Sequence, residues 1–294
     1  SQDNSVTMVR NDFPDTLLIG NQENLGFARG NNQAFAKSRG RYFLLLNPDT
    51  RVLSGSLEKM VEFLDGHPDA GAVAPKYLNP DGTFQRYYYR FPNSLIFPIS
   101  QTLPGVLISR KIMRKFLKNY YYLKDGDRFN AVCAIDQPAA SALIVRSALF
   151  KGEDLFDERF AIFLNDVDLC RRIYKKGYRI YFLPDAEIIH YFGKGAGESA
   201  TAIEIKDREF YIDWLRYIRK YHSFCAYVYA KFSLLILLAF FGIRDILGLS
   251  TLNKDKKTVL RNLQRRLVII LEKSSFDGRG SSLIRSYAHT KNFS

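Results

Sequence analysis

This 294-residue sequence has few cysteines and lacks recognisable nucleic-acid-binding motifs. Each of these absences excludes a class of protein. The three cysteines, Cys133, Cys170 and Cys225, are far apart and form no Cys-x-x-Cys pair. An odd number of separated thiols suits neither a disulfide framework nor a thiolate zinc site, so a reducing cytosol fits best. No zinc-finger, RNA-recognition or helix-turn-helix signature occurs, and we therefore expect no nucleic-acid partner.

Long apolar runs are also lacking. Residues 1–12 are polar, so no signal peptide is expected. The most apolar stretch, 224–249, is interrupted by Lys231, which leaves only residues 232–243 unbroken, short of the roughly 20 residues that span a bilayer. We expect this stretch to lie in the membrane interface as a helix or to form a re-entrant hairpin. A span with Lys231 snorkelling to the surface, or a buried core helix, are the alternatives.

Positive charge is in excess, and it is concentrated toward the carboxyl end. The formal net charge is +13, and residues 206–294 hold 17 Lys and Arg against 7 Asp and Glu. Because this basic third also contains the apolar stretch, it favours an anionic membrane surface over nucleic acid as partner. We expect a helical, basic, membrane-associating region at 201–294 that holds the protein on the cytoplasmic face of the cell membrane, as a peripheral or monotopic protein.

Residues 1–200 alternate between strand and helix patterns, which predicts one α/β domain with a mostly parallel sheet and helices on both faces. The expected strands are 16–20, 42–46, 70–77, 139–145, 179–183 and 186–190. The expected helices are 4–11, 34–40, one capped by Ser54 that buries Leu57, Met60, Val61 and Leu64, and one from Asn165 or Asp166 to Gly177 that buries Val167, Cys170 and Tyr174. Helices are also expected at 203–221 and 254–273. The proline-interrupted segment 92–128 is expected to be a mobile lid near the acceptor, or else a solvated helix and loop.

A short apolar strand that ends in a polar turn, Tyr42-Phe-Leu-Leu-Leu-Asn-Pro-Asp-Thr50, is the first candidate functional stretch. Open α/β sheets bind ligands at the carboxyl ends of their strands. Pro48 fixes its own φ and biases Asn47 toward extended backbone, so Asn47 and Asp49 leave the strand end in defined directions. This arrangement suits a diphosphate or its metal, and the alternative is an Asx-type turn.

Two further stretches carry candidate side chains. The Gly- and Asn-rich loop 21–32 would let a backbone approach a ligand closely, or would simply start a helix. Asp166 and Asp168 lie two residues apart at a helix start, so they project from different sides. Asp166 is nearer the crevice, whereas Asp168 can pair with an arginine one turn later, Arg171 or Arg172; helix caps are the alternative for both carboxylates.

Taken in series, five motifs resemble the family 2 glycosyltransferases of the rhamnosyltransferase-like branch, over roughly residues 1–200. They are Asn24-Leu-Gly-Phe-Ala-Arg-Gly-Asn-Asn32, Leu45-Leu-Asn-Pro-Asp-Thr50, Asn79-Pro-Asp-Gly82, Phe156-Asp-Glu-Arg-Phe160 and Asn165-Asp-Val-Asp-Leu-Cys-Arg-Arg172. The resemblance implies a GT-A fold, a nucleotide-diphosphate-sugar donor, a cell-envelope glycan or lipid-linked acceptor, and inversion at the anomeric carbon.

The resemblance also implies roles for individual residues. Asp166 matches the general base that deprotonates the acceptor hydroxyl, and Asn165 stands where the family has Glu. Asp49 and His190 match metal ligands for a divalent cation, Mg²⁺ or Mn²⁺; Asn47 replaces the first Asp of the Asp-x-Asp site, which weakens the charge at the metal and leaves a metal-free mechanism open. The matched donor-binding residues are Asn24, Gly26, Asn32, Asn47, Asp49, Asp136 and Ser141, and Ala140 stands where Gly is usual.

One departure from the family pattern concerns the amino end. Family members begin with a strand, a helix and a second strand that bind the nucleobase, whereas residues 1–5 resemble the segment just after that second strand. By this comparison roughly 40 residues of the expected fold are missing, which would expose an apolar sheet edge. Two other functions therefore stand beside the enzyme: a catalytically inactive, membrane-bound remnant, and a basic module that binds a membrane or an anionic polymer.

Overall fold

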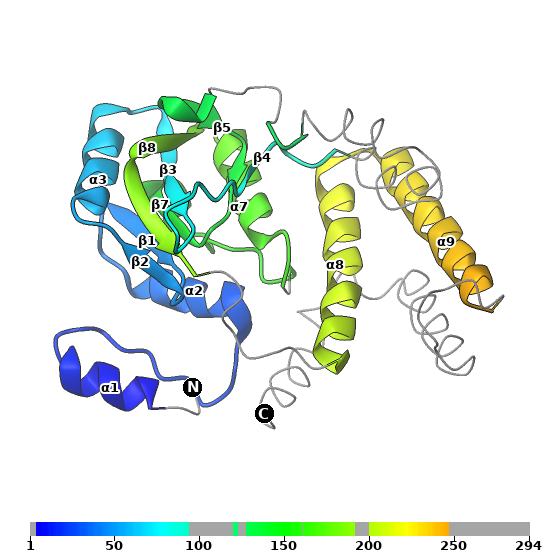
Figure 1. Ribbon diagram of the computed structural model, residues 1–294, viewed down its shortest axis with the longest axis horizontal. Helices are drawn as coiled ribbons and strands as arrows, with labels where there is room; N and C mark the ends of the chain where they lie inside the picture. Colours follow the sequence, from blue (N-terminus) through cyan, green and yellow to red (C-terminus); the bar gives the residue numbers. More distant parts are fainter. Residues whose placement is uncertain (1–3, 94–119, 123–127, 161, 192–199, 247–294) are drawn as a thin grey trace.

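The computed structural model describes residues 4–93, 120–122, 128–160, 162–191 and 200–246 (Figure 1). The strands are β1 (Tyr42–Leu46), β2 (Thr50–Val52), β3 (Ala70–Leu78), β4 (Tyr88–Tyr89), β5 (Cys133–Ile135), β6 (Gln137–Pro138), β7 (Ala142–Arg146) and β8 (Arg179–His190). The helices are α1 (Ser5–Asp12), α2 (Gly26–Lys37), α3 (Ser56–Gly66), η1 (Arg128–Asn130), η2 (Ser147–Phe150), α7 (Asn165–Lys175), α8 (Ala200–Tyr221) and α9 (Phe224–Ile246). Most of the expected lid at 92–128 and all of the expected helix at 254–273 lie outside these residues.

The main sheet is mixed rather than mostly parallel. Its strand order is β1-β7-β3-β8-β2, with β5 paired to β8. Among the described strands only β3 and β8 pair in parallel; β7 runs antiparallel to both of its neighbours, β1 and β3, and β2 and β5 run antiparallel to β8. The prediction of a mostly parallel sheet is therefore wrong. The alternation of strands and helices predicts that β1 and β3 run in the same direction, and they do. It does not predict that β7, from later in the chain, is inserted between them.

Helices cover both faces of this sheet, as expected (Figure 1). Side chains of successive strand residues point to opposite faces, so Val73 of β3 packs with Met60 and Leu64 of α3, whereas Ala72 packs in the cluster that contains Ile173 of α7. Burial of Met60 and Leu64 bears out the predicted core-facing helix. Close approach of α7 to β3 requires a glycine at Gly71, because a Cβ there would lie 2.6 Å from a methyl group of Ile173.

Several local predictions are wrong because tertiary packing determines the element ends. Residues 16–20 form no strand, since no strand of the described chain lies beside them to pair with. The helix predicted to run through residues 34–36 is confirmed as α2, but it begins at Gly26, so the alternative that the stretch 21–32 starts a helix holds in place of a loop up to residue 32. Gly55, with φ of 75°, rather than Ser54, precedes α3. Tyr174, predicted to be buried, is 59% exposed.

The strands expected at 179–183 and 186–190 form one strand, β8, which pairs with β3 along its length. An irregularity interrupts the register, because Pro75 faces Leu183 while the next residue, Lys76, faces Glu187. In the predicted segment 139–145, β7 begins only at Ala142; the preceding residues form a turn at the end of the sheet. That turn, the ends of β1 and β8, and the start of α7 frame the candidate site.

Helix α8 packs against α7, and α9 packs against α8 (Figure 1). Trp214, Tyr217 and Ile218 of α8 are buried in a cluster with Phe160 and with Leu234 of α9. Helix α9 is continuous, so a re-entrant hairpin within Phe224–Ile246 is wrong. Among the described helices, none combines the length and apolarity that a membrane crossing requires.

Candidate functional site

The turn after β1 is anchored to the turn before β7. The backbone N–H of Asn47 donates a 2.8 Å hydrogen bond to the carbonyl of Ser141, and the side-chain amide of Asn47 lies 3.4 Å from Oγ of Ser141. The hydroxyl of Thr50 donates to the carbonyl of Asn47 at 2.6 Å, which closes the turn over Pro48. Two predicted donor-binding residues, Asn47 and Ser141, are therefore in contact.

Asp49 faces His190 across the carboxyl ends of β1 and β8. Nε2 of His190 lies 3.5 Å from Oδ1 of Asp49, and the backbone N–H of Tyr191 donates to the carbonyl of Asp49 at 2.8 Å. The Asp49 side chain is 44% exposed, whereas His190 is buried. The structure thus brings together the two residues that the family resemblance matched to metal ligands.

Gln85 orients the His190 ring. Nδ1 of His190 lies 2.8 Å from Oε1 of Gln85, and Nε2 of Gln85 donates to Oδ1 of Asn79 at 2.7 Å. The second bond assigns Oε1 of Gln85 as the acceptor, so Nδ1 of His190 donates to it and Nε2 is the ring nitrogen that faces Asp49.

A divalent cation fits between Asp49 and His190. A cation bound by both Oδ1 of Asp49 and Nε2 of an unprotonated His190 ring would attract both atoms. Two neighbouring ligand atoms, each bound at about 2.1 Å in octahedral geometry, lie about 3 Å apart. The observed 3.5 Å separation is close to that value. No cluster of three or more His, Cys, Asp or Glu ligands occurs in the described part of the chain, so phosphate oxygens and water would complete such a shell.

Asp166 lies at the first turn of α7, half-buried. Burial raises the pKa of its carboxyl above the ordinary value, and hydrogen bonds from the backbone amides of Val167 and Ala140 partly oppose that shift. Oδ1 accepts the Val167 amide at 2.8 Å. Because Ala140 adjoins Ser141, the contacts run from Asn47 through this turn to Asp166, and a carboxyl with a raised pKa there suits a general base.

Tyr77 supports the turn that carries Ala140 and Ser141. Its hydroxyl is buried within 2.7 Å of the carbonyls of Ala139 and Ala142, and accepts the amide of Ala142 at 2.9 Å. The hydroxyl can donate to only one of the two carbonyls at a time. Tyr77 holds the backbone directly beneath the candidate base.

Leu164, which precedes α7, has a left-handed backbone with φ of 57°. This conformation costs a non-glycine residue about 1–3 kcal/mol and persists only where the surroundings enforce it. Two residues later, the backbone amide of Asp166 donates to Oδ1 of Asn165 at 2.8 Å, so a neighbouring side chain holds the first turn of the helix. Asp166 thus comes directly after a strained turn.

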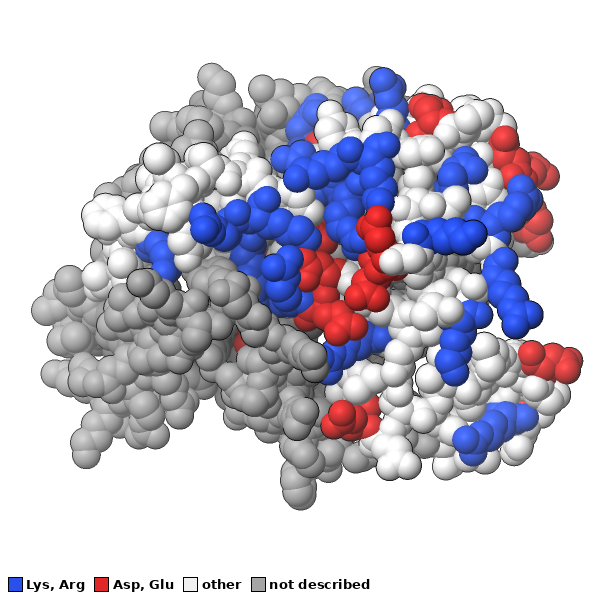
Figure 2. Space-filling model, turned by 180° about the vertical axis from the view of Figure 1, so that it is seen from behind, with Lys and Arg blue, Asp and Glu red and all other residues white. Residues whose placement is uncertain are grey.

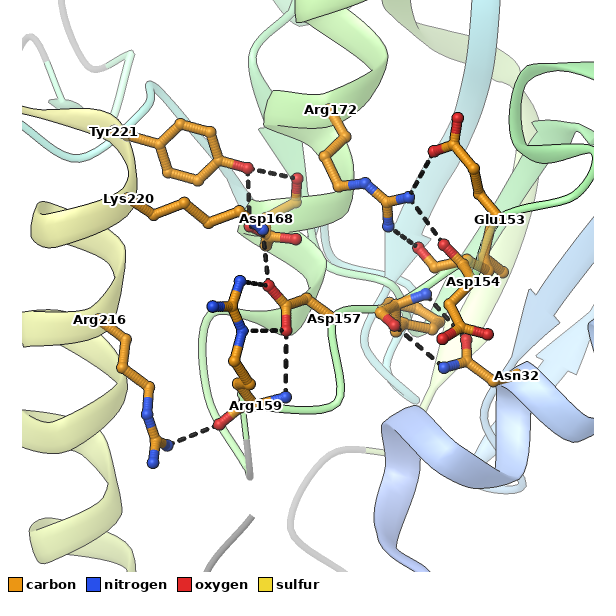
Figure 3. Close-up of polar contacts among 12 residues, drawn as sticks. Asn32, Glu153, Asp154, Asp157, Arg159, Asp168, Arg172, Arg216, Lys220 and Tyr221 are labelled. Atoms are coloured by element: carbon orange, nitrogen blue, oxygen red, sulfur yellow. Dashed lines mark hydrogen bonds and ion pairs between the residues drawn. The ribbon is translucent and has the colours of Figure 1, made fainter. Parts of the chain in front are cut away.

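Asp168 points toward α8 (Figure 3). It is fully buried, and its Oδ1 accepts hydrogen bonds from Nζ of Lys220 at 2.6 Å and from the hydroxyl of Tyr221 at 2.7 Å. The expected pairing with Arg171 or Arg172 is wrong. A partner on α8 outcompetes a neighbour on α7 because the Asp168 side of α7 is covered by α8.

Lys220 also binds the loop before α7. Its Nζ donates to Oδ2 of Asp157 at 2.7 Å, and Arg159 chelates the same carboxylate (Figure 3). Burial by itself raises the pKa of Asp157, but the hydrogen bonds and charges of Arg159 and Lys220 outweigh it and hold that pKa well below the ordinary value. The segment 157–168 is therefore tied to α8 at both ends.

The remaining predicted donor-binding residues make contacts within the protein. Oδ1 of Asn24 accepts the amide of Gly26 at 2.9 Å at the start of α2. Asn32 is buried and makes a pair of hydrogen bonds with the backbone of Phe156, accepting at 2.8 Å and donating at 3.0 Å. Asp136 accepts the amide of Phe91 at 3.0 Å. These contacts neither bring Asn24 and Asn32 to Asp49 nor test their predicted roles.

Sequence reasoning missed Gln85, Tyr77 and Asp213. Gln85 lies in the aromatic segment after the turn at 79–82, where nothing nearby marks it as a partner of His190. Tyr77 was predicted only as the end of a strand. Asp213 lies on α8, and its carboxylate reaches the loop before Asp166. Each contact joins residues far apart in the chain, so no local pattern reveals it.

Known proteins are similar to this chain over part of its length. The family model described as Glycosyl transferase family 2 matches residues 1–140. The N-acetylglucosaminyl-diphospho-decaprenol L-rhamnosyltransferase of Mycobacterium tuberculosis is 24% identical over 208 residues, which cover 65% of this chain and 63% of that protein. The rhamnosyltransferase WbbL of Escherichia coli is 26% identical over 174 residues, covering 56% of this chain and 61% of WbbL. The chain thus spans less than two thirds of either relative.

Among solved structures, the mannosyltransferase PcManGT from Pyrobaculum calidifontis, in complex with GDP-Man and Mn²⁺, is similar with a TM-score of 0.47 and 16% identity. The match covers 99% of this chain and 75% of that chain.

Proposed function

Because residues 1–140 match the family model of glycosyl transferase family 2, we propose that the chain transfers a sugar from a nucleotide-diphosphate donor to a hydroxyl group of a cell-envelope glycan or lipid-linked acceptor, with inversion. The observation that carries the proposal is the series of contacts from the turn that holds Asn47 and Asp49, through Ser141 and Ala140, to Asp166, a carboxyl with a raised pKa. The rhamnosyltransferase relatives favour L-rhamnose as the sugar.

In this reaction the carboxylate of Asp166 accepts the proton of the acceptor hydroxyl. The hydroxyl oxygen forms the new bond to the anomeric carbon from the face opposite the donor phosphate, and the bond from that carbon to the phosphate oxygen breaks. The nucleoside diphosphate leaves with the bonding electron pair, so one displacement inverts the configuration. A positioned base of this kind contributes about 10² to 10⁴-fold in rate.

Asp49 and His190 would hold a divalent cation, Mg²⁺ or Mn²⁺, on the donor diphosphate. When bound, the cation neutralises negative charge that develops on the leaving group. Asn47 lies beside them on the same turn and offers an uncharged amide rather than a second carboxylate. Its contacts with Ser141 hold the turn in place.

The proposal places the protein on the cytoplasmic face of a membrane. Apolar side chains repeat along one exposed side of α9, at Phe224, Val228, Phe232 and Ile236. Cations lie beside its aromatic residues; the Arg219 guanidinium is 5.4 Å from the Phe224 ring centre. Lys and Arg side chains also spread over much of the described surface in Figure 2, beside a central group of acidic residues and further acidic residues toward its edges. Apolar and basic groups together favour an anionic lipid surface.

The test is release of nucleoside diphosphate by the full chain, measured with nucleotide-linked L-rhamnose and with other nucleotide sugars, with Mn²⁺ and a polyprenyl-diphosphate-linked N-acetylglucosamine acceptor. Mass spectrometry of the acceptor identifies the product. We expect transfer that Asp166→Asn abolishes almost completely. Membrane binding without release from any donor, at any metal concentration, would instead support the binding module.

A further inference from the structure

Helix α8 holds the loop before α7 through one carboxylate. Asp213 is fully buried, and its Oδ2 accepts hydrogen bonds from the backbone N–H of Ile162 at 3.2 Å and of Phe163 at 3.0 Å. Its Oδ1 accepts a 3.0 Å bond from Nη1 of Arg216. The same guanidinium donates to the carbonyl of Arg159 at 2.6 Å (Figure 3). Asp213 and Arg216 of α8 therefore bind three backbone groups of this loop.

These bonds lie directly beside the strained residue. Leu164, with φ of 57°, comes directly after Phe163 and directly before Asn165 and Asp166. A left-handed leucine persists only where its neighbours are held in place, and Asp213 holds the two preceding amides. The Phe163 ring also packs edge-on against Phe210 of α8 at 5.3 Å between centroids. The conformation that directs the start of α7 is thus enforced from α8.

Burial of the Asp213 charge would be costly without these partners. A helix can dock on a neighbour by apolar contacts alone, and α8 already has Trp214, Tyr217 and Ile218 in such contacts. The Asp213 carboxylate is therefore not needed merely to dock α8 on its neighbours. Its specific effect is to fix the loop backbone that leads to Asp166. Lys220 of α8 makes a separate contact, with Asp168, two residues after Asp166 in the chain.

We propose that Asp213 is a positioning residue for the catalytic base, which holds the loop 162–164 so that Asp166 is directed at the acceptor hydroxyl. The catalytic part of this inference rests on the proposed function. The structural part, restraint of the loop by Asp213, stands apart from it.

The test compares Asp213→Asn with Tyr221→Phe in the full chain. Asp213→Asn keeps the side-chain volume but replaces one acceptor oxygen by an NH₂ group, so either the loop amides or Arg216 lose their acceptor. Tyr221→Phe removes a hydrogen bond that the same helix makes to Asp168. Three quantities are measured for each: kcat, the KM for the nucleotide sugar, and amide hydrogen exchange at Ile162 and Phe163 by NMR.

For Asp213→Asn we expect exchange at both amides to rise about tenfold or more. We expect kcat to fall about 10²-fold, with the donor KM nearly unchanged, because a misplacement of about 1 Å at a catalytic group has that effect and the metal ligands are held separately. Tyr221→Phe is expected to lower the melting temperature while leaving kcat and both exchange rates as in the wild type.

Unchanged exchange at Ile162 and Phe163 in Asp213→Asn would overturn the inference, whatever the activity. Faster exchange with an unchanged kcat, or an equal loss of kcat in Tyr221→Phe, would overturn the positioning role. If Asp166→Asn itself keeps full turnover, the proposed function fails, and the exchange rates still decide whether Asp213 restrains the loop.

Discussion

Nε2 of His190 and Oδ1 of Asp49 lie 3.5 Å apart at the ends of two strands that are not neighbours in the sheet, β8 and β1. The turn after β1 leads into β2, which pairs with β8, and this pairing brings Thr50 opposite His190. The register of a three-residue strand therefore sets the distance between the two candidate metal ligands.

Replacement of Asp49 by alanine should remove the metal dependence of donor binding. Without the carboxylate, His190 is the remaining ligand of the pair, and a hard cation binds imidazole alone weakly. Isothermal titration of a nucleotide sugar, with and without Mn²⁺, measures this. Glu62→Ala, at an exposed carboxylate on α3, is the control and should keep the effect of Mn²⁺. Equal enhancement by Mn²⁺ in both variants would contradict the metal assignment.

Gln85→Leu should weaken Mn²⁺ binding without touching a ligand atom. The amide of Gln85 fixes the tautomer and orientation of the His190 ring, and loss of such a partner typically lowers metal affinity about 10- to 100-fold. Electron paramagnetic resonance of free Mn²⁺ gives the affinity. Gln33→Leu, at an amide on α2 that hydrogen-bonds Asn21, is the control. Affinity unchanged by Gln85→Leu would mean that His190 does not bind the ion.

Asp166→Asn should lower kcat about 10² to 10⁴-fold, or roughly 3 to 5 kcal/mol of barrier, with little change in donor affinity. The base works in its deprotonated form, and burial raises its pKa. Turnover should therefore be lost as the pH falls through that raised pKa, at a higher pH than an ordinary aspartate of about 3.9 would give. A profile of kcat against pH measures this loss of turnover on the acidic side. If Asp166→Asn shows the same acidic loss, the titrating group is not Asp166.

Asp168→Asn should affect stability more than turnover. Lys220 keeps Asp157 as a partner, so the expected loss is about 1–3 kcal/mol, the cost of an imperfectly satisfied buried group, and not the larger cost of an unpaired buried ion. Urea unfolding gives the free energy, and kcat is compared with that of Asp166→Asn. A large fall in kcat for Asp168→Asn beside a tolerant Asp166→Asn would exchange the roles of the two carboxylates.

Phe232→Asp should weaken membrane binding. Phe232 is 61% exposed on the apolar side of α9, and burial of a phenylalanine side chain contributes about 1.5–3 kcal/mol, which corresponds to roughly 10- to 100-fold in partition. Cosedimentation with phosphatidylglycerol vesicles measures it. Leu17→Asp, at a 69% exposed leucine far along the chain, is the control. Equal binding of Phe232→Asp, or equal binding of the wild type to neutral vesicles, would contradict the proposal.

The sequence by itself determined features that depend on neighbours in the chain. The i, i+3, i+4, i+7 spacing that includes Met60 and Leu64 predicted which face of α3 is buried, because side-chain direction results from local backbone geometry. The apolar run before Pro48 predicted β1 and its polar turn, which are confirmed; the prediction that this strand is buried is wrong, because β1 lies at an end of the described sheet and only Leu45 of it is fully buried.

The tertiary structure alone decided the partners. It placed β7 between β1 and β3, so the sheet is mixed, and it paired Asp168 with Lys220 rather than with an arginine on its own helix. It also brought Asp213 to the loop before Asp166. These choices depend on which surfaces bury the most apolar area against each other, a property of the whole chain that no window of a few residues contains.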